Sequence, residues 1–146
     1  AELFEFVLAL FIEIVDFHIF SHFYRILNVK ERLIMRNFMT LTSQSEIDTF
    51  LNQYPVALLY FSSPNCSVCL GLLPQVQDLM EQFPDIACGL IDTHVVPTVA
   101  SKYSILSVPA ILVFVKEKEY LREARFIPLQ KLKNNLLRII DHIDVL

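Results

Sequence analysis

The chain has 146 residues, a length typical of a single domain, and 54% of these residues are apolar while 19% are charged. This composition argues against a disordered chain and for a packed core. The net charge is only −4, with acidic and basic residues mixed along the chain, so no nucleic-acid partner is expected because no concentrated Lys/Arg stripe is present.

The N-terminal segment, residues 3–27, is very apolar but is interrupted by charged side chains such as Glu5, Glu13 and Asp16. Its polar residues recur every three or four positions, which predicts a helix with a narrow polar stripe and a broad apolar face. The stretches without a charge are shorter than the roughly 20 residues that span a bilayer, so membrane insertion is not expected.

Three interpretations of this extra apolar helix stay open. It packs on its own domain or on a second copy of the chain as a homodimer, it lies on a membrane surface, or it is foreign to the domain. The acidic stripe weakens the membrane interpretation, because anionic lipids favour Lys and Arg. The charged residues 28–37 indicate a linker, so we place an N-terminal extension at 1–37 and one domain at 38–146.

From residue 38 onward the sequence predicts alternating strands and helices. A short strand is expected at 38–42, and Ser43 with Glu46 forms a capping box that begins a helix ending near Gln53. The continuous apolar run 56–61 is typical of a strand covered on both faces of a sheet.

The middle of the domain continues this alternation. Residues 66–82 predict a helix with Pro74 in its interior, where the ring should kink it. Residues 86–91 predict a second buried strand, and Pro97 suits the first turn of a short helix that ends near Tyr103.

The last part predicts a hairpin and a helix. Two strands, 108–116 and 120–126, are joined through the polar residues KEKE, and Pro128 begins an amphipathic helix. The order β-α-β-α-β-α-β-β-α indicates an α/β fold, with a mixed central sheet flanked by helices. The apolar face of the last helix is expected to carry Leu129, Leu132, Leu136, Ile140 and Ile143.

Two cysteines separated by two residues, Cys66 and Cys69, follow a buried strand and begin a helix. A helix N-terminus exposes unpaired N–H groups and a partial positive charge, which stabilise a thiolate. Thiolate is the species that attacks disulfides, and the spacing lets the second thiol reach a mixed disulfide formed by the first. We therefore expect Cys66 to be the nucleophile and Cys69 the resolving thiol.

A zinc site is the alternative for a CxxC pair, with Cys88 and His94 as further ligands. No second CxxC is present, and Cys88 lies in an apolar run where a free cysteine behaves as a small core residue. We expect no metal and no catalytic role for the histidines, which are His18, His22, His94 and His142.

Residues 38–146 resemble the thioredoxin family. The matching features are the strand VALLYFSS before the CxxC pair, Pro74 five residues after Cys69, the strand end at Ile91-Asp92, and the segment KYSILSVPAILVF. The resemblance implies a thioredoxin fold and a cis peptide bond before Pro109, which would face the cysteines and turn the Val108 backbone toward an extended substrate.

The sequence also departs from the family pattern. The family usually carries Trp before the first cysteine and Gly-Pro between the pair, whereas this chain has Asn65, Ser67 and Val68. Tyr60 stands where the family has a buried Asp, and Cys88 aligns with the partner Lys of that Asp. The usual proton acceptor for the resolving thiol is therefore absent, which favours slower exchange.

The surface near the sulfurs is expected to be apolar or neutral, and a flat surface of this kind suits transient docking of protein partners. We expect a cytoplasmic protein dithiol–disulfide oxidoreductase that needs no cofactor, acts on protein disulfides and is reduced by an upstream disulfide reductase. The alternative is a weakly active or inactive interaction module that uses its N-terminal helix. The expected contact residues are Pro64, Val68, Leu70, Val108 and Pro109.

Overall fold

The computed structural model describes residues 38–143. The predicted N-terminal helix and the linker at 28–37 lie outside the described residues, as do the homodimer and membrane-surface interpretations that depend on them. Within residues 38–143, no helix is both long enough and apolar enough to span a membrane.

The described part of the chain contains strands and helices in the order that the sequence predicted. The strands are β1 (Met39–Thr40), β2 (Val56–Ser62), β3 (Ala87–Asp92), β4 (Ala110–Val115) and β5 (Lys118–Ala124). The helices are α2 (Gln44–Gln53), α3 (Ser67–Met80), α4 (Val99–Lys102) and α5 (Leu129–Asp141).

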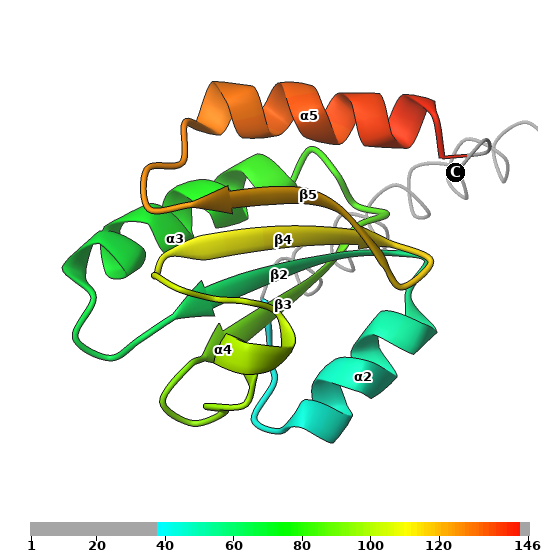
Figure 1. Cartoon of the computed structure of the whole chain (residues 1–146). Helices are drawn as coiled ribbons and strands as arrows, with labels where there is room; N and C mark the ends of the chain where they lie inside the picture. Colours follow the sequence, from blue (N-terminus) through cyan, green and yellow to red (C-terminus); the bar gives the residue numbers. More distant parts are fainter. Residues whose placement is uncertain (1–37, 144–146) are drawn as a thin grey trace, which may run out of the picture. The chain divides into compact units, whose positions relative to one another are not determined.

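The strands form one mixed sheet in the order β1-β3-β2-β4-β5. Strands β1 and β2 pair with β3 in parallel, whereas β4 is antiparallel to both β2 and β5. Helices α3 and α5 cover one face of this sheet, and α2 and α4 cover the other (Figure 1). The predicted three-layer α/β architecture is confirmed.

Strand β2 is apolar throughout because both of its faces are buried. Its alternate residues Leu58 and Tyr60 pack beneath α3 and α5, whereas Leu59 and Phe61 pack toward α2 and α4. All four side chains are fully buried. The central position of β2 sets the place of the CxxC pair, which follows the end of this strand.

The capping box predicted for α2 is present in a modified form. The Ser43 side chain accepts a hydrogen bond from the Glu46 N–H (3.2 Å). The Glu46 carboxylate reaches back to the N–H of Thr42 (2.6 Å) and to its hydroxyl (3.1 Å), one residue before the N-cap. The Ser43 bond satisfies a donor that the first turn of a helix leaves without a partner, and the Glu46 bonds hold the residue before the N-cap against this turn.

The β4–β5 hairpin is confirmed, but its turn is shorter than the predicted KEKE loop. Only Lys116 and Glu117 lie between the strands, with φ values of 48° and 67°. Positive φ at both central residues is what a two-residue type I′ turn requires, and this turn matches the twist of the strands. Lys118 and Glu119 therefore belong to β5, which contradicts the loop prediction.

Other boundaries also differ from the sequence predictions, and strand β5 ends at Ala124 and not at residue 126. Helix α4 begins at Val99 after Thr98, so Pro97 precedes the helix and does not occupy its first turn. Strand β4 begins at Ala110 and not at residue 108, because the residues before it turn through a cis peptide bond.

The last helix, α5, packs its apolar face on the sheet as predicted. Leu132 and Leu136 are fully buried in the same cluster as Tyr60 and Cys69. The remaining predicted members of this face are partly buried against that cluster, and they are Leu129, Ile140 and Ile143. The helix therefore supports the side of the sheet that carries the cysteines.

Candidate active site

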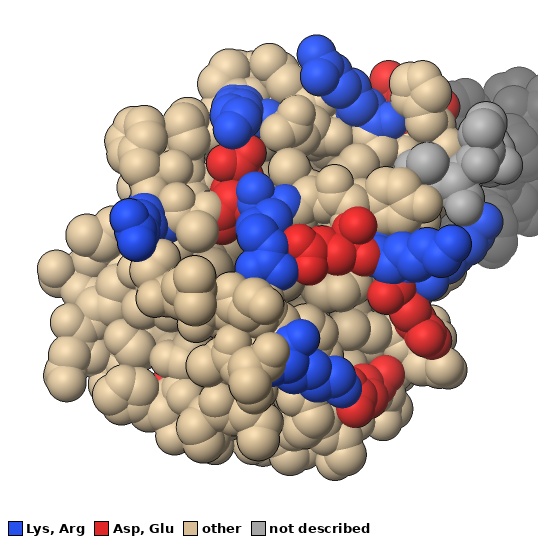
Figure 2. All heavy atoms as spheres, in the orientation of Figure 1, with Lys and Arg blue, Asp and Glu red and all other residues tan. Residues whose placement is uncertain are grey.

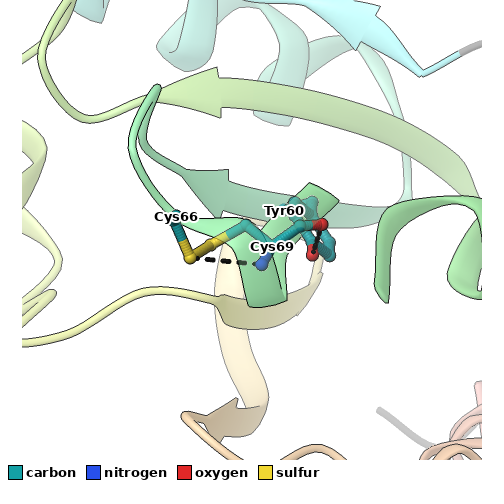
Figure 3. Close-up of a disulfide and its surroundings, with 3 residues drawn as sticks. All are labelled: Tyr60, Cys66 and Cys69. Atoms are coloured by element: carbon teal, nitrogen blue, oxygen red, sulfur yellow. Dashed lines mark hydrogen bonds between the residues drawn. A yellow bond between two sulfur atoms is a disulfide. The ribbon is translucent and has the colours of Figure 1, made fainter. Parts of the chain in front are cut away.

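The cysteine pair forms a disulfide at the start of α3. The Sγ atoms of Cys66 and Cys69 are 2.08 Å apart, and their Cα atoms are 5.2 Å apart. Cys66 is the N-cap residue of α3, and its Sγ accepts a hydrogen bond from the Cys69 N–H at 3.1 Å (Figure 3). The first sulfur therefore lies at the positive end of the helix, as the sequence predicted.

The two sulfurs differ in their access to solvent. Cys69 is completely buried in the core cluster beneath α3 and α5, whereas Cys66 is partly exposed. Ser67 and Val68, the residues between them, are exposed. A partner molecule can therefore approach Cys66 from solvent, whereas Cys69 is reached only through Cys66.

Tyr60 lies behind the cysteine pair on β2. Its fully buried hydroxyl donates a hydrogen bond to the backbone carbonyl of Cys69 at 2.8 Å (Figure 3). Burial raises the pKa of Tyr60 to about 12, because the phenolate would lose its hydration. Tyr60 therefore stays protonated at neutral pH and cannot accept the proton of the Cys69 thiol.

The peptide bond between Val108 and Pro109 is cis, which confirms the expectation from the family resemblance. Pro109 is buried, and Val108 is partly buried against both core clusters. The Pro109 carbonyl accepts a hydrogen bond from the Arg125 N–H at 2.9 Å. This bond ties the segment before β4 to the segment that follows β5.

The other predicted contact residues lie at the surface around the disulfide. Pro64 is exposed in the loop after β2, and Val68 and Leu70 are 60% and 63% exposed on the first turns of α3. Figure 2 shows mostly neutral side chains at the end of the molecule where β2 ends and α3 begins. Pro64, Val68 and Leu70 thus present uncharged side chains around the disulfide, whereas the exposed Arg125 places a positive charge beside Val68.

A hollow of about 450 Å³ beside the cysteine loop was not predicted from the sequence. Val68, on the first turn of α3, lines this hollow together with Arg125 and Phe126, which follow β5. No local sequence motif predicts a role for Arg125 and Phe126. The register of the β4–β5 hairpin places them beside this hollow. Ala124 pairs with Ala110, so the residues after β5 lie beside Pro109.

The zinc alternative has no support within residues 38–143, where no group of three or more His, Cys, Asp or Glu side chains could hold a metal ion. Cys66 and Cys69, two of the four residues considered as zinc ligands, are joined in the disulfide. Cys88 is a free thiol that is partly buried against the core cluster, and burial raises its pKa to about 12. His94 and His142 are exposed.

The thioredoxin family model matches residues 38–138, about the same range that carries the sheet and all the helices described above. A relative from Bacillus subtilis (strain 168), the thioredoxin-like protein YdfQ, is 37% identical over 105 residues, covering 72% of this chain and 94% of that protein. The chain belongs to the thioredoxin family.

Solved thioredoxin structures agree with this assignment. A mutant thioredoxin from Halobacterium salinarum NRC-1 superposes with a TM-score of 0.63 at 26% identity, covering 68% of this chain and 88% of that one. A thioredoxin from Trypanosoma brucei brucei gives a TM-score of 0.66 at 16% identity, covering 73% and 94%, and supports the fold alone. Membership of the thioredoxin family and the disulfide-bonded CxxC pair support a thiol–disulfide oxidoreductase.

Proposed function

We propose that this thioredoxin-family protein exchanges its Cys66–Cys69 dithiol with disulfides of partner proteins, with Cys66 as nucleophile and Cys69 as resolving thiol. The observation that carries the proposal is the disulfide between one accessible and one buried sulfur at the start of α3. An accessible sulfur at a helix N-terminus suits attack on a partner, and a buried neighbour suits release of that partner.

The exchange proceeds in two steps. The Cys66 thiolate attacks one sulfur of the partner disulfide, forms a mixed disulfide and releases the other partner sulfur as a thiolate. Cys69 then loses its proton and attacks the Cys66 sulfur, which releases the second partner thiolate. The partner gains two electrons and two protons, and the protein is left with the Cys66–Cys69 disulfide.

The proton of Cys69 needs an acceptor other than Tyr60, whose hydroxyl is protonated and directed at the Cys69 carbonyl. The partner thiolate released in the first step, or water, takes this proton. We therefore expect resolution of the mixed disulfide to be slower than with a carboxylate behind the cysteines.

The partner contacts the protein through the neutral surface around the disulfide. Pro64 and Val68 flank Cys66, and Val108 with Pro109 forms the segment beside which an extended partner strand would lie. An upstream disulfide reductase would return the protein to its dithiol form, and no cofactor is required. A cytoplasmic location stays a prediction from the sequence.

Reduction of insulin disulfides tests the proposal. The wild-type chain, kept reduced by dithiothreitol, should accelerate insulin precipitation, Cys66→Ser should abolish the acceleration, and Cys69→Ser should accumulate a mixed disulfide with insulin. Cys88→Ser is the matched control, because Cys88 lies outside the disulfide and should leave the rate unchanged. A wild-type rate equal to that of Cys66→Ser removes the enzymatic proposal.

The rival interpretation is an interaction module with little redox activity that dimerises through residues 1–37. It depends on residues outside the described range, and the disulfide-bonded pair favours exchange chemistry. Equilibrium sedimentation of the full chain, with and without residues 1–37, tests the dimer separately from the insulin assay.

A further inference from the structure

We propose that Arg125 is a specificity-determining residue, which binds a carboxylate of the partner protein next to the disulfide under attack. The inference rests on the proposed function, since it names the class of partner that this site prefers. It predicts a preference for partner segments with Asp or Glu beside the half-cystine.

The position of Arg125 is the first support. The residue lines the same hollow as Val68, which lies between the two cysteines. Its side chain extends toward the segment before β4, where Nε donates a hydrogen bond to the Ser107 hydroxyl at 3.3 Å. Its backbone N–H donates a hydrogen bond to the Pro109 carbonyl. This bond holds the Arg125 backbone beside the segment that a partner strand would follow.

The charge of Arg125 is the second support, because no carboxylate neutralises it in the described structure. The ion pairs recorded within residues 38–143 join Lys102 to Asp48, Arg122 to Glu119, and Lys131 to Glu123. These three cations have intramolecular acidic partners, whereas the guanidinium of Arg125 bonds a neutral hydroxyl within the described residues. Its unused donors remain available to an incoming anion.

The surroundings of Arg125 strengthen an ionic contact with a bound partner. Phe126 is 83% exposed and lines the hollow together with Leu72 and Leu129. A partner segment that covers these apolar side chains removes water from the guanidinium, and a charge pair is stronger where water is displaced. The shape and the charge of the hollow therefore suit an acidic peptide better than a basic one.

Three peptides with one internal disulfide test the inference. They are identical except at one residue next to a half-cystine, which is Glu, Gln or Lys, and kcat/KM for their reduction is measured with wild type and with Arg125→Gln. For each protein, kcat/KM with the Glu peptide is divided by kcat/KM with the Gln peptide. This ratio should be about fivefold higher for wild type than for Arg125→Gln, which corresponds to about 1 kcal/mol. The intrinsic reactivity of each peptide cancels in this comparison.

Arg138→Gln is the control, because it removes the same charge from the exposed surface of the last turn of α5. It should keep the wild-type Glu preference, and Arg125→Lys should keep part of it. The preference should fall as salt rises, since the screening length shortens from about 10 Å at 0.1 M to about 3 Å at 1 M.

The other outcomes overturn the inference. An equal Glu to Gln ratio for wild type and Arg125→Gln, or an equal loss of rate with all three peptides, shows that Arg125 does not select the partner. Turnover of the peptides with a Glu to Gln ratio that Arg125→Gln does not change removes this inference and leaves the proposed function intact. No turnover of any peptide by the wild type removes both.

Discussion

The hydroxyl of Tyr60 donates a hydrogen bond to the carbonyl of Cys69, and both residues are fully buried. This bond joins the central strand β2 to the first turn of α3, so the backbone of Cys69, the proposed resolving residue, is held by the middle of the sheet. The residue behind the cysteines thus acts as a neutral hydrogen-bond donor to the backbone, where other members of the family are expected to carry a carboxylate.

Tyr60→Phe should destabilise the protein by about 1 kcal/mol, because it removes one buried hydrogen bond and little apolar surface. Urea denaturation followed by circular dichroism measures the change. Tyr120→Phe is the control, since Tyr120 is exposed on the edge strand β5 and its loss should stay within about 0.5 kcal/mol. Equal effects of the two substitutions would contradict the role assigned to the Tyr60 hydroxyl.

The three cysteines of the reduced protein should react with iodoacetamide at different rates. Cys66 is partly exposed and should be alkylated first, whereas Cys69 is fully buried and should react more slowly. With a pKa of about 12, on the order of one Cys88 thiol in ten thousand is ionised at pH 8, so Cys88 should react slowest.

Mass spectrometry of peptides from timed alkylation measures these rates, and the denatured chain provides the reference in which the three rates converge. The Cys88 rate should rise with pH well beyond pH 8, because the thiolate fraction keeps growing up to its pKa. If Cys88 reacted as fast as Cys66 in the folded protein, the assignment of the accessible sulfur would be wrong.

The two glycines of the chain should respond to alanine with opposite signs. A Cβ at Gly89 on β3 would lie 2.8 Å from Leu41 Cδ1 and 3.0 Å from Leu59 Cδ2, so Gly89→Ala should cost about 1–3 kcal/mol through overpacking. Gly71 lies in α3 with nothing within 4 Å of its Cβ position, and Gly71→Ala should stabilise the helix by about 0.5–1 kcal/mol.

Thermal and urea unfolding of the two alanine variants test this contrast, and each variant serves as the control for the other. A loss of stability in Gly71→Ala would show that the backbone at this position is not ordinary helix. An unchanged Gly89→Ala would show that the Leu41 and Leu59 side chains move aside without cost.

The carboxylate of Asp48 links α2 to α4 through Lys102 Nζ, at 2.6 Å. The hydrogen bond from Lys102 is the largest cause that lowers the pKa of Asp48 below its ordinary value of 3.8. A lowered folded-state pKa stabilises the protein above the unfolded pKa, and this stabilisation is lost as pH falls through the folded value.

Asp48→Asn should therefore be less stable than wild type at pH 7, and the difference should shrink as the pH falls below about 4. Urea midpoints between pH 7 and pH 3 measure the difference. Asp78→Asn, at an exposed position of α3, is the control and should leave the midpoint at pH 7 nearly unchanged. A difference for Asp48→Asn that does not vary with pH would exclude the ion pair as its cause.

Local patterns in the sequence were sufficient to predict the order of the elements. The apolar run at 56–61, the Ser43 cap and the spaced leucines of α5 each depend on neighbours in the chain, so their structure is readable without the fold. The predicted ends of the strands and helices are less accurate than their order. The two-residue turn at Lys116 and Glu117, for example, depends on how the two strands twist against each other.

Local pattern is enough to predict a CxxC pair that begins a helix after a buried strand, and the motifs around it resemble the thioredoxin family. The surroundings of the pair depend on the tertiary structure. Tyr60 reaches the Cys69 carbonyl because β2 runs beneath α3, and Arg125 meets Pro109 because Ala124 pairs with Ala110 across the hairpin. Such contacts join residues of different elements, and they follow from strand register and packing, which no local pattern records.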